Sequence, residues 1–238
     1  MALLRSAAFL RFQRRFLSDR VLETIRIQPI EPGQKLEVTQ FLAKHYVQAD
    51  PAARFLQLQP SEMESLFNDL FDHYMLNPVS MAVYSPKNLL LGVSLNSVVD
   101  FVSKKGPFLL DLHRRYPARV VTLFQLIEKI ERELPELMPN VRNWFCFNIS
   151  CVRPDFARQG LATKMWELSL EQGVEARCAG VFSLCTSYNA QMGLGKHFGL
   201  GILKAVPYSE CRDEKGKKIF GKMQNAPHSM MLMAKLLE

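Results

Sequence analysis

The residues from Cys151 to Ala162 have the types and spacing of an anion-binding loop. An apolar stretch, residues 144–152, leads into the loop, and a helical pattern that ends near Ala176 follows it. The first N–H groups of a helix have no partner within the helix and lie at the positive end of its dipole, which suits a pyrophosphate. Gly160 allows close approach of a phosphate oxygen, and Arg158 adds a cation. The predicted donors are the backbone N–H groups of Arg158, Gln159, Gly160, Leu161 and Ala162.

This loop resembles the acetyl-CoA loop of the GCN5-related N-acetyltransferase superfamily, whose pattern is Arg/Gln-x-x-Gly-x-Gly/Ala. Residues 157–162 read Ala-Arg-Gln-Gly-Leu-Ala. Ala157 therefore stands where the family has Arg or Gln, which puts one side-chain contact in question and leaves the backbone contacts in place. Without its context the loop could also be only a tight turn between a strand and a helix.

The residues after the loop extend the resemblance. Residues 181–187 predict a buried strand, residues 188–197 a short helix, and residues 197–200 a turn that opens another strand. The superfamily has the same order, with its helix opening near an Asn, here Asn189. Residues 226–237 look like the last strand of the invertebrate arylalkylamine (dopamine) N-acetyltransferases. The resemblance is good over residues 143–237, weaker over 25–60, and absent between them.

The resemblance implies an α/β fold with a mixed, mostly antiparallel sheet and helices on both faces. It also implies acetyl transfer from acetyl-CoA to a small primary amine, an arylalkylamine such as dopamine, serotonin or tyramine, by direct attack on the thioester. The implied cofactor-binding residues are Cys151, Val152, Ala157, Arg158, Gln159, Gly160, Leu161, Ala162 and Asn189.

Direct transfer needs a base for the amine, a donor for the oxyanion and a proton or hydrogen bond for the thiolate. The family implies that the oxyanion donor is the backbone N–H of Val152 or Cys151, where the fourth strand separates from the fifth. The family's base is a Glu in an Asp-Glu-Pro-Leu stretch, and the matching residue here is Asp50. Its carboxylate is one methylene shorter, so a water could bridge the gap, and burial would raise its pKa. Alternatively, Asp50 simply caps the helix that begins at Pro51.

A serine of the family's fifth strand corresponds to Thr186, or to Ser187 after a one-residue shift. Either hydroxyl could protonate the thiolate or relay a proton to Asp50. A Thr at the end of a strand is also an ordinary strand residue.

Composition predicts one globular domain over residues 21–238. The chain has 238 residues, 48% of them hydrophobic and 22% charged, and no apolar run approaches the ~18 residues of a membrane span. Its five cysteines form no C-x-x-C pair, and the histidines lack the spacing of a zinc helix. We therefore expect no structural metal, no disulfide framework and a monomer.

The positive charge gathers at the N-terminus. Residues 1–20 hold five arginines against Asp19 alone, and thus carry +4 of the net charge of +7, so we expect no nucleic-acid partner. On a helix, Phe9, Phe12 and Phe16 lie opposite Arg11, Arg14 and Arg15. This pattern predicts a mitochondrial transit peptide over residues 1–18. The alternative is a basic tail on a cytoplasmic protein.

The remaining pattern places the site residues on elements. We expect a strand over residues 21–30, helices over 36–47 and 61–75, and a strand pair at 80–84 and 89–99. A long helix over 116–134 is expected to stop at Pro135.

Two other functions agree with the same sequence. One is a mitochondrial glycine-type acyl-CoA N-acyltransferase, for which an Arg in the acceptor pocket would be the sign. The other is a CoA-binding module without turnover, because Ala157 and Asp50 depart from the family pattern.

The N-terminal pattern gives the first testable prediction. Residues 1–17 should direct a reporter protein to mitochondria, because import signals need the opposed apolar and basic faces. Replacing Arg11, Arg14 and Arg15 by Glu should leave the reporter in the cytosol. A uniform cytosolic signal from the intact leader would contradict the prediction.

Overall fold

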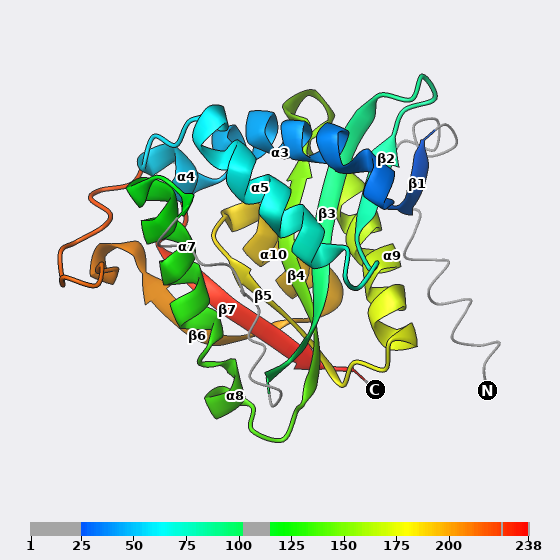
Figure 1. The fold of residues 1–238 in the computed structure, drawn as a ribbon. Coiled ribbons are helices and arrows are strands. Elements are labelled where there is room, and N and C mark those ends of the chain that lie inside the picture. The colour runs from blue at the N-terminus through cyan, green and yellow to red at the C-terminus, as the bar shows by residue number, and fades with distance from the viewer. Residues whose placement is uncertain (1–24, 102–114, 225, 238) are drawn as a thin grey trace.

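The fold is seen in a computed structural model that describes residues 25–101, 115–224 and 226–237. The predicted transit peptide lies outside these residues. A seven-stranded sheet forms the centre of the molecule, with neighbouring strands in the order β1-β2-β3-β4-β5-β7-β6 (Figure 1). The strands are β1 (Arg26–Pro29), β2 (Met81–Tyr84), β3 (Leu90–Asp100), β4 (Asn143–Val152), β5 (Gly180–Cys185), β6 (Gly201–Pro207) and β7 (Ser229–Leu236).

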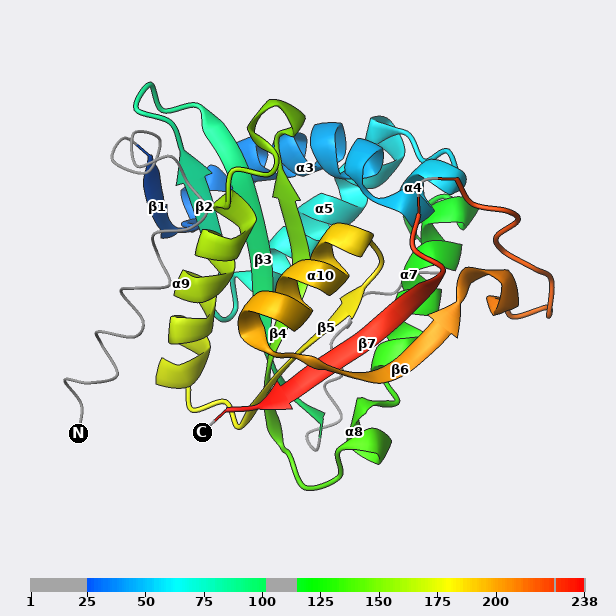
Figure 2. The same ribbon diagram turned by 180° about the vertical axis from the view of Figure 1, so that it is seen from behind.

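Neighbouring strands run antiparallel except β4 and β5, which run parallel. Helices cover both faces of the sheet: α3, α5 and α7 lie on one face and α9 and α10 on the other (Figures 1 and 2). These two features confirm the predicted fold class. The helices are α3 (Lys35–Ala49), α4 (Pro51–Phe55), α5 (Pro60–Tyr74), α7 (Ala118–Glu131), α8 (Leu134–Leu137), α9 (Leu161–Glu175) and α10 (Tyr188–Phe198), with 3-10 turns η2 (Pro32–Gln34), η4 (Pro154–Phe156) and η5 (Tyr208–Glu210).

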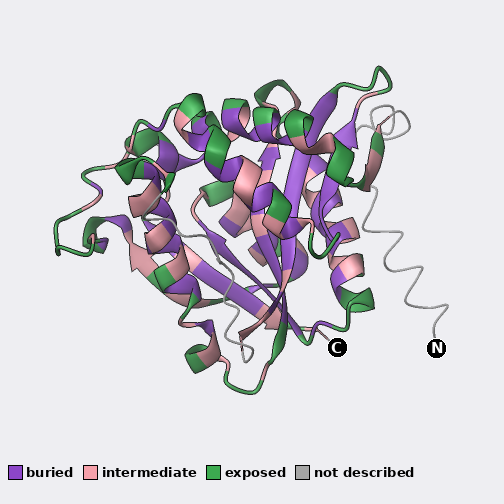
Figure 3. Cartoon of the chain, in the orientation of Figure 1, coloured by how far each residue is buried: buried purple, intermediate pink, exposed green. Residues whose placement is uncertain are grey.

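Apolar residues at helical spacing explain how the helices attach to the sheet. In α5 every third or fourth residue is buried and faces the strands, while the opposite side is exposed (Figure 3). The central strands β2 and β5 are buried along their whole length, as expected for strands covered on both sides. The buried residues of α5 are Met63, Leu66, Phe67, Leu70, Phe71 and Tyr74.

Most predicted elements are present, with three differences at their ends. The helix predicted over residues 116–134 is α7, which ends at Glu131, and Pro135 lies inside the first turn of α8 rather than ending a helix. A proline is tolerated there because first-turn N–H groups need no helical acceptor. The strand predicted over residues 181–187 ends at Cys185, so Ser187 begins the next helix instead.

The parallel ladder between β4 and β5 is short. Its pairs run only from Trp144 with Gly180 to Cys146 with Phe182. Beyond them the Ser183 hydroxyl, a side chain, donates to the Phe147 carbonyl (2.9 Å). On the other edge of β4 the pairing with β3 shifts by one residue, which leaves Asn148 as a bulge. β4 therefore bends where it parts from β5, and a gap opens toward the carboxyl ends of the two strands.

One carboxyl group, on the last residue of α7, is buried with an oxygen that has no hydrogen-bond partner among the described residues. Glu131 is 2% exposed, and its Oε2 has no hydrogen-bond partner among the described residues. Burial, with a smaller contribution from Glu128, raises the pKa of Glu131 to about 8. Tyr74 and Cys146 lie close enough for the same carboxyl to raise the pKa of each. Glu131 is thus protonated at neutral pH in the folded protein.

This proton predicts a pH-dependent stability. Above pH 4.5 the unfolded chain has released the Glu131 proton and the folded chain has kept it until about pH 8, so the free energy of unfolding falls across this window. Glu131→Gln should remove that slope and stabilise the protein by roughly 3 kcal/mol at pH 7, at ~1.4 kcal/mol per pH unit. Denaturant unfolding from pH 4.5 to 8 measures it, with exposed Glu136→Gln as control. Equal pH slopes in the Glu131 variant and the parent would contradict the prediction.

Candidate functional site

The loop after β4 turns sharply before it enters helix α9. Arg158 (φ 61°) and Gly160 (φ 79°) both adopt the left-handed conformation, which costs a non-glycine residue about 1 kcal/mol. Such turns direct successive N–H groups into one concave surface that can hold an anion. Helix α9 begins at Leu161, and Lys164 is the first residue to donate back, to the Gly160 carbonyl (3.0 Å). The N–H groups of residues 161–163 therefore have no acceptor within the helix.

The first turn of α9 contains two of the five residues predicted as donors, and one residue that was not predicted. Leu161 and Ala162 lie in the first turn of α9 as expected, and Thr163, which the sequence analysis missed, joins them. Arg158 and Gln159 belong to the turn before the helix. Helix numbering from Gly160, its N-cap, would have placed Thr163 correctly.

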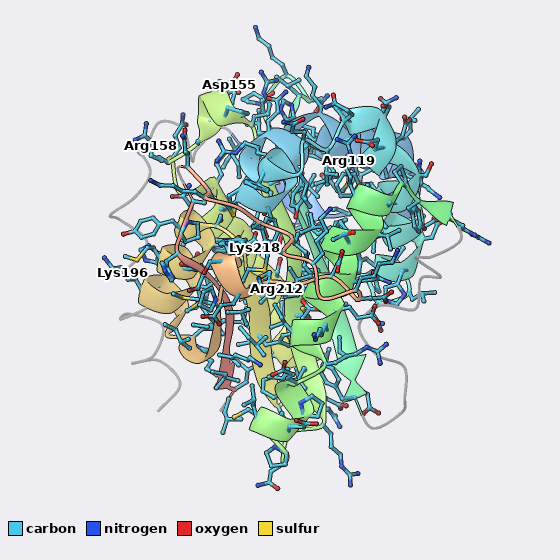
Figure 4. All side chains as sticks on the ribbon, turned by 90° about the vertical axis from the view of Figure 1, so that its left-hand side faces the viewer. Arg119, Asp155, Arg158, Lys196, Arg212 and Lys218 are labelled. Atoms are coloured by element: carbon cyan, nitrogen blue, oxygen red, sulfur yellow. The ribbon has the colours of Figure 1, made fainter. Side chains whose placement is uncertain are left out.

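The charged side chains around the loop include an ion pair and two exposed cations. Asp155 is paired with Arg153, whose guanidinium donates to both carboxylate oxygens (3.0 and 2.6 Å) and lowers the pKa of Asp155. Arg158 is exposed, and Figure 4 shows it on the same flank as Lys196 of α10. Ala157 and Asn189 are exposed too, at the ends of η4 and at the start of α10. The flank thus offers two cations beside the loop.

The two predicted oxyanion donors, the N–H groups of Cys151 and Val152, point in opposite directions from β4. The N–H of Arg153 donates to the Leu91 carbonyl on β3 (2.9 Å). Since N–H groups alternate along a strand, Cys151 also directs its N–H to β3, and Val152 directs its N–H to the opposite edge. That edge is the one from which β5 has diverged. Val152 therefore has the N–H that faces the gap.

Asp50 lies at the junction of α3 and α4. It is 5% exposed, and its own N–H donates to the Tyr46 carbonyl (2.8 Å). Oδ1 accepts from the Ala53 N–H (2.8 Å), which is the capping role that the sequence left open. Oδ2 accepts from the Thr186 hydroxyl (2.5 Å). One carboxylate thus caps a helix and is joined to the end of β5.

The surroundings of Asp50 change its acidity. Burial raises its pKa, and the hydrogen bond from Thr186, those from the backbone of Ala53 and Ala52, and the charge of Arg54 oppose this rise. A carboxyl group with a raised pKa is a better proton acceptor for an amine than an exposed one.

The two predicted hydroxyls have different places. Thr186, the first residue after β5, donates to Asp50. Ser187 caps α10, where its side-chain oxygen accepts from the Ala190 N–H (3.3 Å). The structure therefore brings Thr186, and not Ser187, to the carboxylate. The roles of both in catalysis stay predictions.

Two tyrosines that were not predicted from the sequence complete this cluster. Tyr46 lies near Asp50 and Cys151, each of which raises its pKa, although burial is the larger cause. Tyr208 donates its hydroxyl hydrogen to the Thr186 carbonyl (2.6 Å). Tyr46, one helical turn before Asp50, could have been found from its spacing, whereas Tyr208 has no local signal.

Among the described residues, no group of three His, Cys, Asp or Glu side chains is arranged to hold a metal ion, and no helix is long and apolar enough to cross a membrane. All five cysteines are unpaired and buried. Burial raises the pKa of the Cys151 thiol to about 12, so this thiol is protonated at neutral pH.

Comparison of the chain with protein-family models and with curated protein sequences gives no match. Comparison with solved structures gives clear similarities over 90% of this chain, each with a TM-score of 0.74. One is arylalkylamine N-acetyltransferase 2 from Aedes aegypti, at 21% identity and 99% of that chain. Another is the C-terminal condensation domain of Ebony in complex with beta-alanyl-dopamine, at 16% identity and 99% of that chain. A third is the Drosophila melanogaster polyamine N-acetyltransferase, at 13% identity and 100% of that chain.

At these identities the likeness shows the fold. The chain has the fold of the GCN5-related N-acetyltransferases, as the loop and the elements after it predicted. Its structure is similar to those of the arylalkylamine N-acetyltransferases of insects.

The loop geometry gives a prediction for acetyl-CoA, the co-substrate implied by the sequence resemblance. Gly160→Val should weaken acetyl-CoA binding roughly 100-fold, because a branched side chain at φ 79° displaces the loop and its charge-assisted hydrogen bonds. Titration calorimetry measures the change. Gly216→Val, at φ 76° in open surroundings far along the chain, is the matched control for backbone strain and should bind normally. Equal acetyl-CoA affinity in the Gly160 variant and the parent would show that the loop does not bind acetyl-CoA.

Proposed function

We propose that the protein is an N-acetyltransferase that moves the acetyl group of acetyl-CoA to a primary amine, and specifically to an arylalkylamine such as dopamine, serotonin or tyramine. The observation that carries the proposal is the buried Asp50 carboxylate, joined to Thr186 at the end of β5. It lies in one cluster with Tyr46 and Cys151, and Cys151 precedes Val152, whose N–H faces the gap.

In this proposal the protein supplies a base for the amine, a donor for the oxyanion and a donor for the thiolate. Asp50 takes a proton from the ammonium, directly or through the Thr186 hydroxyl, which can accept from the amine while it donates to Asp50. The amine nitrogen attacks the thioester carbonyl carbon, and the oxyanion accepts a hydrogen bond from the Val152 N–H. Collapse breaks the C–S bond and releases the CoA thiolate, which takes up the second proton lost by the amine nitrogen and leaves as the thiol. Ser187 can donate to that thiolate, since capping uses only its oxygen as an acceptor.

Direct attack is favoured over an acyl-enzyme on Cys151. A thiol is nucleophilic as the thiolate, and burial holds the pKa of Cys151 near 12. Phosphates of acetyl-CoA would meet the first turn of α9, with Arg158 and Lys196 on the same flank (Figure 4).

Arg119, at the start of α7, makes its contacts within the protein. Its guanidinium donates to the Glu62 carboxylate (2.7 Å) and to the Leu56 and Gln57 carbonyls (3.3 and 3.1 Å). An arginine held in this way is not available to pair with a substrate carboxylate. The proposal of an amine acceptor rather than an amino acid is supported by the structural similarity to the arylalkylamine N-acetyltransferase of Aedes aegypti.

The experiment that tests the proposal is a panel of arylalkylamines, polyamines and amino acids, assayed for release of the CoA thiol. Turnover of an arylalkylamine supports it. Turnover of glycine alone would instead identify a glycine-type acyltransferase, and acetyl-CoA binding without any turnover would identify a binding module.

We also propose that the protein is imported into mitochondria, on the pattern of residues 1–18, and that it acts there as a monomer.

The two roles of Asp50 can be separated by substitution. Asp50→Asn keeps an oxygen for the Ala53 N–H but cannot accept a proton, so it should retain the parent's melting temperature and lose kcat/KM at neutral pH by roughly 100-fold. Asp50→Ala should lose both. The loss of rate should shrink as the pH approaches ~10, where an alkylamine arrives deprotonated.

Initial rates from pH 7 to 9.5, with melting temperatures of the same samples, measure both effects. Acetyl-CoA affinity should not change. A constant ratio of variant to parent rates across this range would show that Asp50 is only a helix cap.

A further inference from the structure

Thr186 makes two hydrogen bonds, and only the one to Asp50 takes part in the proposed reaction. Its hydroxyl donates to Asp50, while its carbonyl accepts from the Tyr208 hydroxyl (2.6 Å). Thr186 follows β5, whose last pair with β7 joins Cys185 to Met231. The strand ladder therefore no longer fixes the backbone of Thr186. The hydrogen bond from Tyr208 supplies a constraint in its place.

Tyr208 is itself fixed by packing. It begins η5, directly after β6, and is 3% exposed. Its ring meets that of Phe220 edge to face with centroids 5.0 Å apart, and Phe220 meets Phe55 in the same way at 5.6 Å. Phe55 is the last residue of α4, the helix that Asp50 caps. The contacts thus form a closed path from Asp50 through Thr186 and back to α4.

We propose that Tyr208 is a positioning residue for the proton relay: its hydroxyl fixes the Thr186 backbone so that the Thr186 hydroxyl stays on the Asp50 carboxylate. This inference rests on the proposed function. Loss of the Tyr208 hydroxyl frees the Thr186 carbonyl and loosens the contact with Asp50. The Thr186 hydroxyl is then less well aligned with the Asp50 carboxylate. The rings of residue 208, Phe220 and Phe55 stay packed.

The acidity of Asp50 reports this alignment. A hydrogen bond donated by Thr186 favours the ionised carboxylate and lowers its pKa, so a looser bond raises the pKa. The groups that face Asp50 are Tyr46 from α3, Arg54 from α4, Thr186 after β5 and Tyr208 from η5. Tyr208→Phe leaves the other three in place, and the ring of residue 208 keeps its contact with Phe220.

The test compares Tyr208→Phe with Tyr74→Phe. Tyr74 is also buried, but its hydroxyl has no hydrogen-bond partner among the described residues, and it has no part in the relay. Tyr208→Phe should lower kcat/KM about tenfold at pH 7 and move the acid limb of the pH profile about one unit upward, with acetyl-CoA affinity unchanged. Tyr74→Phe should follow the parent profile. A Tyr208→Phe profile that superimposes on the parent's would overturn the proposal.

A second measurement needs no turnover. Carboxyl-carbon NMR can follow the titration of Asp50, assigned by its loss in Asp50→Asn. A higher pKa of Asp50 in Tyr208→Phe than in the parent supports the positioning role even where no acceptor is acetylated, which would contradict only the proposed function. An unchanged pKa overturns the positioning role.

A double-mutant cycle gives an independent check. If Tyr208 acts through Thr186, then adding Tyr208→Phe to Thr186→Val should cost little further activity, whereas in a Thr186→Ser background its effect should persist. Fully additive losses in the Thr186→Val background would show that Tyr208 acts by another route.

Discussion

The candidate site depends on the separation of β4 from β5 after only three residue pairs. Two parallel strands must be joined by a crossover, and here the crossover contains α9. The N-terminus of α9 is thereby fixed beside the end of β4, which is also where the gap opens. The first-turn N–H groups of α9, the N–H of Val152 that faces the gap and the hydroxyl of Thr186 all lie at the carboxyl ends of the two strands. Open sheets commonly bind ligands at such an edge, where neighbouring strands part.

The energetics of burial explain why one carboxylate can serve at this edge. A buried carboxyl group is costly unless hydrogen bonds satisfy its oxygens. In Asp50 each oxygen has a donor, the Ala53 N–H and the Thr186 hydroxyl, and these bonds oppose the effect of burial on its pKa. Glu131 is buried to a similar degree, but one of its oxygens has no partner among the described residues, and its pKa rises to about 8. Burial raises the pKa of both carboxyl groups, and only in Asp50 do hydrogen bonds to both oxygens oppose the rise.

Local patterns were enough to predict the parts of the fold that depend on local chemistry. The Asp-Pro pair at residue 50 predicts a helix start, and Gly160 predicts a loop that allows close approach before a helix. The contact between Asp50 and Thr186, 136 residues apart, came from the family resemblance and not from spacing. The bulge at Asn148 and the bond from Tyr208 were not predicted. Strand register and the packing of distant segments decide both, and neither leaves a signal in neighbouring residues.

Much of this site consists of backbone groups. The proposed phosphate donors are N–H groups of the loop and of α9, and the proposed oxyanion donor is the N–H of Val152. Any residue except proline supplies an N–H, so these positions constrain the path of the chain more than the identity of its side chains. Only Gly160, through its backbone conformation, and the cluster of Asp50, Thr186 and Tyr208 depend on particular residue types. A chain can therefore keep this architecture at a TM-score of 0.74 while sharing 13 to 21% of its residues with the structures it resembles.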